Sequence, residues 1–153
     1  MKTRITFLAF ALILLSCGQQ EINLDEQVKP LLRVKWDTFT NAWEQEDART
    51  CAAVYVDDGV NIPPQWEVNN GIPEIEKFYD FLFDNNISSE YQHDILSISG
   101  DTKNIIEMGK FKVNWVRNDS TSWTYYARTM THWINVEGDW KIKTFIFNNP
   151  PED

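Results

Sequence analysis

Apolar residues recur at intervals of three and four between Val28 and Trp43, the spacing that gathers side chains on one face of a helix. The stripe consists of Val28, Leu31, Leu32, Trp36, Phe39 and Trp43. Pro30 suits the first turn of a helix better than its interior. We therefore predict a helix that begins near residues 29–31 and buries this stripe.

Two further helices are predicted downstream. Charged residues interrupt the stripe at 44–47, and Asp47 is suited to act as the N-cap of a short helix over 48–55. The apolar positions of 72–85 again follow a helical period, with Pro73 at the start.

The rest of the chain alternates between apolar and polar residues, as half-buried strands do. The predicted strands span 60–62, 91–99, 104–117, 122–136 and 140–148. Asp57-Asp58-Gly59 is predicted to turn the chain into the first strand, and Pro63-Pro64 to end that strand. Helices followed by long antiparallel strands predict an α+β fold. A strongly bent sheet wrapped around helices would enclose an apolar cavity, which is a common kind of ligand site.

The N-terminal residues have a different character. Lys2 and Arg4 precede an apolar run over 5–15 that is too short to span a bilayer, as in a secretory signal. The run ends in LLSCG, which resembles the bacterial lipobox around a lipid-bearing cysteine, here Cys17. We predict a lipoprotein signal peptide over 1–16 and a lipid-anchored tether over 17–27. The chain would then be a lipoprotein anchored to a membrane of the bacterial cell envelope. The alternative is an ordinary secretory signal with an incidental cysteine.

Charge and cysteine content narrow the possible partners. The chain has 14 Lys and Arg against 23 Asp and Glu, a net charge of −9, which argues against binding a nucleic-acid backbone. Aromatic residues make up 14% of the chain, which is ample for a core. If Cys17 carries lipid, Cys51 has no disulfide partner, and its helical context favours a small buried residue.

Several segments together resemble a known family. They are Trp36, YVDDG at 55–59, GIPEI at 71–75, Phe78-Tyr79, RTMTHW at 128–133 and GDWKI at 138–142. In order and spacing they resemble the ketosteroid-isomerase-like and SnoaL-like group of the nuclear-transport-factor-2-like superfamily, over about 28–149, with a tail at 150–153. The resemblance implies a cone-shaped barrel, a strongly bent antiparallel sheet wrapped around helices. It also implies a homodimer formed through the outer face of the sheet.

The resemblance also implies a pocket between the long helix and the inner face of the sheet, with Trp66 over its mouth. The other lining residues would be Phe39, Trp43, Asn61, Pro63, Phe111, Val113, Trp115, Tyr125, Thr129, Thr131, Phe145 and Phe147. The family's isomerases abstract a proton with a carboxylate at the position of Pro63. Their two donors to the enolate oxygen align with Phe39 and, approximately, Thr129. This proton-transfer machinery is therefore not expected in this chain.

Other candidate chemistry is weakly supported. Asp57 and Asp58 would point to opposite faces of a strand, and adjacent Asp residues more often shape a turn. His93 and His132 lie in strand patterns, and no His, Asp or Glu spacing fits a metal site, so neither metal nor cofactor is expected.

We therefore expect a non-catalytic module that binds a small apolar or aromatic molecule. One alternative is a cofactor-independent SnoaL-like enzyme of the isomerase, cyclase or hydrolase class, acting on a small organic substrate. The other is a protein-interaction module whose pocket is only core.

The lipid anchor can be tested directly. Cys17→Ser removes the predicted acylation site, so the protein should move from the membrane fraction to the soluble fraction of fractionated cells, because several acyl chains hold a protein far more firmly than its surface does. Cys51→Ser is the control and should stay with the membranes. If Cys17→Ser stays there as well, the anchor lies elsewhere.

Overall fold

The computed structural model describes residues 23–85, 87–117 and 121–150. The predicted signal peptide, Cys17 and most of the tether lie outside these residues. The last tether residues form a short helix, α1 (Leu24–Gln27), and Leu24 packs against the core. The main domain therefore starts a few residues earlier than the helical stripe suggested.

The predicted helices are present with small changes at their ends. They are α2 (Lys29–Glu44), α3 (Ala48–Ala53) and α4 (Ile72–Asn85). Pro30 lies in the first turn of α2. Asp47 caps α3, because the Thr50 backbone N–H donates to its carboxylate at 3.0 Å. Helix α3 ends before Tyr55, which was predicted to be helical and instead begins a strand.

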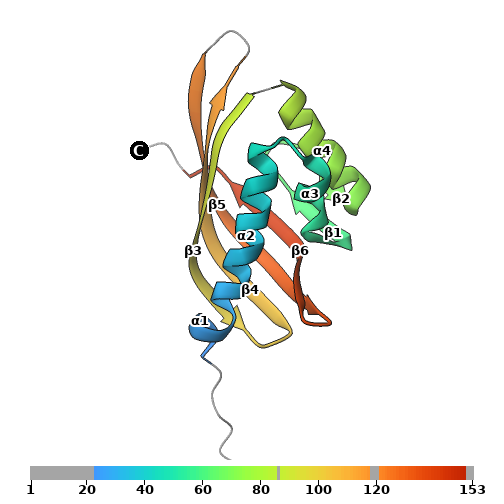
Figure 1. Cartoon of the computed structure of the whole chain (residues 1–153), viewed down its shortest axis with the longest axis vertical. Coiled ribbons are helices and arrows are strands. Elements are labelled where there is room, and N and C mark those ends of the chain that lie inside the picture. The colour runs from blue at the N-terminus through green and yellow to red at the C-terminus, as the bar shows by residue number, and fades with distance from the viewer. Residues whose placement is uncertain (1–22, 86, 118–120, 151–153) are drawn as a thin grey trace, which may run out of the picture.

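Six strands form one open, mixed sheet rather than a closed antiparallel barrel (Figure 1). They are β1 (Tyr55–Ile62), β2 (Asn69–Asn70), β3 (Ile87–Gly100), β4 (Asn104–Val116), β5 (Ser122–Val136) and β6 (Asp139–Asn148). Their order is β2-β1-β6-β5-β4-β3, and β1 pairs with β6 in parallel. The short strand β2 was not among the strands predicted from the sequence. Figure 1 shows α2 lying across the sheet, with α3 and α4 on the same side.

Asp57-Asp58-Gly59 does not precede the first strand but lies within it. Between the register pairs Tyr55–Ile142 and Val60–Thr144, β1 advances further than β6, so this stretch bulges out of the ladder. Lys143 Nζ holds the bulge through the Asp58 carboxylate at 2.6 Å. Turn-forming residues therefore bend the strand here without ending it.

The core lies between α2 and the inner face of the sheet. Leu32, Trp36, Phe39 and Trp43 are buried, whereas Leu31 of the same stripe is 50% exposed. Strand β4 alternates buried and exposed positions along nearly its whole length, as a strand with one covered face must. Among the described residues, no helix has the length and apolarity needed to cross a membrane.

Candidate functional site

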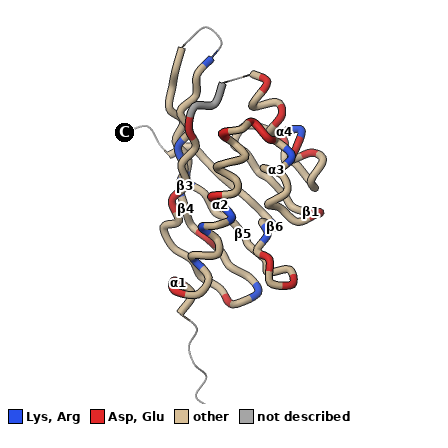
Figure 2. Tube along the Cα trace, in the orientation of Figure 1, with Lys and Arg blue, Asp and Glu red and all other residues tan. Residues whose placement is uncertain are grey.

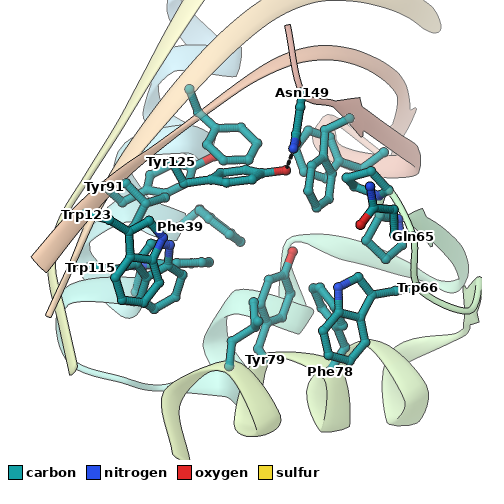
Figure 3. A pocket seen from close by; sticks show the side chains of 18 residues that line it. Phe39, Gln65, Trp66, Phe78, Tyr79, Tyr91, Trp115, Trp123, Tyr125 and Asn149 are labelled. Atoms are coloured by element: carbon teal, nitrogen blue, oxygen red, sulfur yellow. Dashed lines mark hydrogen bonds between the residues drawn. The ribbon is translucent and has the colours of Figure 1, made fainter. Parts of the chain in front are cut away.

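An aromatic cavity of about 240 Å³ opens between α2, α4 and the inner face of the sheet (Figure 3). Twelve of the eighteen residues found to line it are aromatic. Strands and helices bring these rings together from distant parts of the sequence: Trp43 lies on α2 and Trp115 on β4, yet their ring centroids are 5.4 Å apart. Such a wall favours a flat, apolar guest.

Most of the residues expected in the pocket surround this cavity. Those in its lining are Phe39, Trp43, Pro63, Trp66, Phe111, Val113, Trp115, Tyr125, Phe145 and Phe147. Asn61, Thr129 and Thr131 are not in the lining but are buried elsewhere on the inner side of the sheet. Trp66 is 54% exposed and packs on α4 against Phe78 and Phe81.

Eight lining residues were missed by the sequence analysis: Pro64, Gln65, Phe78, Tyr79, Leu82, Tyr91, Trp123 and Asn149. Phe78, Tyr79 and Leu82 lie on the apolar face predicted for the helix at 72–85, so that face could have pointed to them. Tyr91 and Trp123 become neighbours of the other rings only through the pairing of β3 and β5 with β4.

The lining found here contains no Asp, Glu, His, Lys or Arg side chain. Its polar groups include three phenols. The Tyr79 hydroxyl lies 3.0 Å from that of Tyr55, and burial raises the pKa of Tyr79 well above its usual value. Burial also raises the pKa of Tyr125, whose hydroxyl donates to Asn149 Oδ1 (Figure 3). The cavity therefore presents neutral hydroxyls within aromatic walls.

The helix beside the cavity is acidic. Helix α4 carries Glu74, Glu76, Asp80 and Asp84 against one cation, Lys77, and Figure 2 shows these charges along its length. Because α4 also supplies part of the cavity lining, its charge disfavours the approach of anionic molecules.

A polar cluster is buried beside the cavity and centres on Glu107 of β4, which is 0% exposed. Its carboxylate accepts three N–H donors. Trp36 Nε1 lies 3.1 and 3.0 Å from Oε1 and Oε2, and Trp133 Nε1 lies 2.9 Å from Oε2. His93 Nε2 lies 2.7 Å from Oε1. A buried carboxylate requires such partners, because desolvating an unpaired charge is costly.

His93 is held on all sides within this cluster. Trp36 stacks on its ring at a centroid distance of 3.7 Å, and the Tyr91 hydroxyl lies 3.3 Å from its Nδ1. Arg33 donates to its backbone oxygen at 2.5 Å. Burial lowers the pKa of His93; its hydrogen bond to Glu107 and the charge of Glu107 oppose this shift, while the charge of Arg33 adds to it. We conclude that burial dominates and that His93 is neutral at pH 7.

The sequence indicates no partner for His93, because neighbouring residues on a strand point to opposite faces of the sheet. Its partner lies across the β3–β4 pairing, fourteen positions along the chain. Gly109 leaves the room that the pair requires. A Cβ at Gly109 would lie 2.9 Å from His93 Nε2 and 2.7 Å from Thr129 Oγ1, closer than packed atoms allow.

Other polar atoms near this cluster have no hydrogen-bond partner among the described residues. They are both amide atoms of Asn61 and the hydroxyls of Thr129 and Thr131. In the register of the sheet, Asn61, Phe145, Thr131 and Glu107 form one row across four strands. Within the described part of the chain, no group of three or more His, Cys, Asp or Glu residues is arranged to hold a metal ion.

Comparisons with known proteins identify the fold. No family model and no curated protein matches the sequence. A ketosteroid isomerase-like protein from Erwinia carotovora atroseptica superposes with a TM-score of 0.70 at 13% identity, covering 80% of this chain and 96% of its own. A nuclear transport factor 2-like superfamily protein from Salmonella enterica serovar Typhimurium gives 0.69 at 14% identity, covering 84% and 94%.

A third solved structure, described as an aromatic ring hydroxylase from Novosphingobium aromaticivorans, gives a TM-score of 0.69 at 15% identity and covers 81% of this chain and 90% of its own. The expected fold is therefore confirmed. This chain has the α+β cone fold of nuclear-transport-factor-2-like and ketosteroid-isomerase-like proteins, and identities this low extend the likeness to the fold alone.

The buried state of His93 predicts a pH dependence of stability. Its folded pKa lies below the unfolded value of about 6.5, so the unfolded chain binds the proton first and stability falls as the pH falls below about 6.5. Urea unfolding at pH 7.5, 6.5 and 5.5 should show that His93→Gln flattens this loss by up to about 1.4 kcal/mol per pH unit.

His132→Gln, on the outer face of β5, is the matched control for the loss of an imidazole. An unchanged slope in His93→Gln would show that folding does not shift the pKa of His93, and would contradict its neutral buried state.

Proposed function

We propose that this protein binds a small, uncharged aromatic molecule in the cavity and does not transform it. The observation that carries the proposal is the composition of the lining, which is dominated by aromatic rings and has no acidic, basic or imidazole side chain. An aromatic guest could stack against the Trp43, Trp115 and Phe111 rings. The acidic charge of α4 favours a neutral molecule over an anion.

The apolar area that such a guest can bury sets the range of dissociation constants to expect. An aromatic side chain buries about 150–250 Å² of surface, worth roughly 4–6 kcal/mol at about 25 cal/mol per Å². That free energy corresponds to dissociation constants between about 1 mM and about 50 µM. Polar contacts could tighten binding further.

Catalysis is the weaker candidate for this cavity. Pro63, at the position of the isomerase base, is in the lining, and so is Phe39, at the position of an oxyanion donor. The buried pair of His93 and Glu107 lies outside the lining. A guest in the cavity therefore meets no strong base directly.

We further propose that the protein is anchored to a membrane of the bacterial envelope through lipid on Cys17. The support is the basic start, the apolar run and the LLSCG segment of the sequence. In this arrangement the anchor holds the binding domain at the membrane, while its negative net charge keeps its surface from adhering to anionic lipids.

The outer face of the sheet suits contact with a second copy of the chain. Met108, Tyr126 and Met130 are 47%, 57% and 40% exposed on neighbouring strands β4 and β5. We propose a homodimer through this face, and Met130→Glu should shift the mass measured by light scattering from dimer to monomer. The exposed Val34→Glu on α2 is the control. A monomeric wild type would exclude this assembly.

Binding can be tested with 2-methoxynaphthalene, a flat neutral probe, followed by calorimetry on the full-length chain. The wild type should bind, and Trp43→Ala and Trp115→Ala should each weaken binding by about tenfold or more, because each removes a wall of the cavity. Tyr126→Ala on the outer face should bind like the wild type. Equal binding by all four proteins would place the ligand site elsewhere.

A further inference from the structure

Tyr91 connects the cavity to the buried cluster around Glu107. Its side chain is part of the cavity lining and packs against the rings of Phe39, Trp43 and Phe111. Its hydroxyl reaches His93 Nδ1 at 3.3 Å, and His93 Nε2 reaches Glu107 at 2.7 Å. A continuous chain of hydrogen bonds therefore runs from the fully buried carboxylate to a residue of the binding site.

The chemistry of the cluster sets the direction of these hydrogen bonds. A carboxylate only accepts, so the hydrogen between Glu107 and His93 must lie on Nε2. A neutral imidazole has one N–H, so Nδ1 is then an acceptor. The Tyr91 hydroxyl must therefore donate its hydrogen to Nδ1. Stacking against Trp36 fixes the plane of the imidazole and keeps Nδ1 aimed at Tyr91.

With its hydrogen committed to His93, the Tyr91 oxygen can offer a guest only its lone pairs. Tyr125 is in the same position, because its hydrogen is donated to Asn149 Oδ1. Two of the phenols in the lining are thus hydrogen-bond acceptors, although a free phenol would also donate.

We propose that the ligand is an aromatic molecule carrying a hydroxyl or N–H donor, received by the oxygen of Tyr91, and that Glu107 and His93 are positioning residues that keep Tyr91 an acceptor. The inference rests on the proposed binding function and adds the chemical class of the guest. A guest with only acceptor atoms would face the lone pairs of Tyr91 and Tyr125 and lose a hydrogen bond that it makes in water. The acidic charge of α4 favours the neutral form of such a guest.

A matched pair of probes measures this preference. 2-Naphthol and 2-methoxynaphthalene share one ring system, but only the first has a donor. Calorimetry on the full-length chain gives the two dissociation constants and their ratio. Tyr91→Phe should raise the dissociation constant of 2-naphthol by about tenfold relative to that of 2-methoxynaphthalene. Tyr126→Phe, which removes an exposed hydroxyl from the outer face, should leave the ratio unchanged.

Glu107→Gln tests the positioning role because it should reverse the hydrogen bonds. Oε2 accepts from both tryptophans at 2.9 and 3.0 Å, whereas Oε1 faces His93 at 2.7 Å and has only a longer, shared contact with Trp36 at 3.1 Å. An amide can therefore keep both tryptophans on its oxygen and turn its NH₂ toward Nε2. His93 would then carry its hydrogen on Nδ1 and donate to Tyr91, which frees the Tyr91 hydrogen for the guest. The variant should therefore lower the dissociation constant of 2-methoxynaphthalene relative to that of 2-naphthol by a similar factor.

The outcomes separate the two proposals. If neither probe binds the wild type, the binding function fails and the inference fails with it. If both probes bind and neither Tyr91→Phe nor Glu107→Gln changes their ratio, only the inference is overturned. Nitrogen-15 NMR of the wild-type histidines, assigned with His132→Gln, remains decisive if a variant does not fold. We expect His93 to be the Nε2–H tautomer, and the Nδ1–H tautomer would overturn the proposal.

Discussion

The inner side of the sheet is organised around a carboxylate that has no access to water. Glu107 lies on β4, and its three N–H donors come from α2, β3 and β5, so one side chain ties four elements together. Leaving any donor out would leave a buried polar group unsatisfied, which costs about 1–3 kcal/mol and more when a charge is involved. The position of α2 on the sheet is therefore fixed by hydrogen bonds as well as by apolar packing.

This cluster and the cavity share structural elements but differ in chemistry. Trp36 contacts the rings of Phe39 and Phe145, which belong to the cavity lining, so the polar cluster abuts the aromatic site. Residues that hold α2 in place also hold the cavity wall. Tyr91 has one end in each region, and through it a buried charge can influence what the cavity accepts without entering the cavity itself.

Much of the fold could be read from local patterns, because helix and strand periods are set by neighbouring residues. The stripe from Val28 to Trp43, the N-cap at Asp47 and the strand at 122–136 all depend on spacing within one segment. The bulge at 57–59 was misread as a turn, because the same residues favour both and only pairing with β6 distinguishes them. The parallel pairing of β1 with β6 brings together segments far apart in sequence, and no local pattern reports that.

The sequence alone determined most of the helices and strands and supplied the aromatic residues that a cavity needs. It also suggested most of the residues that line the cavity, through resemblance rather than through geometry. Only the tertiary structure decided that His93 contacts Glu107 and that Tyr91 connects this cluster to the cavity. It also decided that two tryptophans, Trp36 and Trp133, donate hydrogen bonds to the same carboxylate. The reason is physical: these contacts depend on strand register and on how α2 lies on the sheet, and burial then sets the charge of His93.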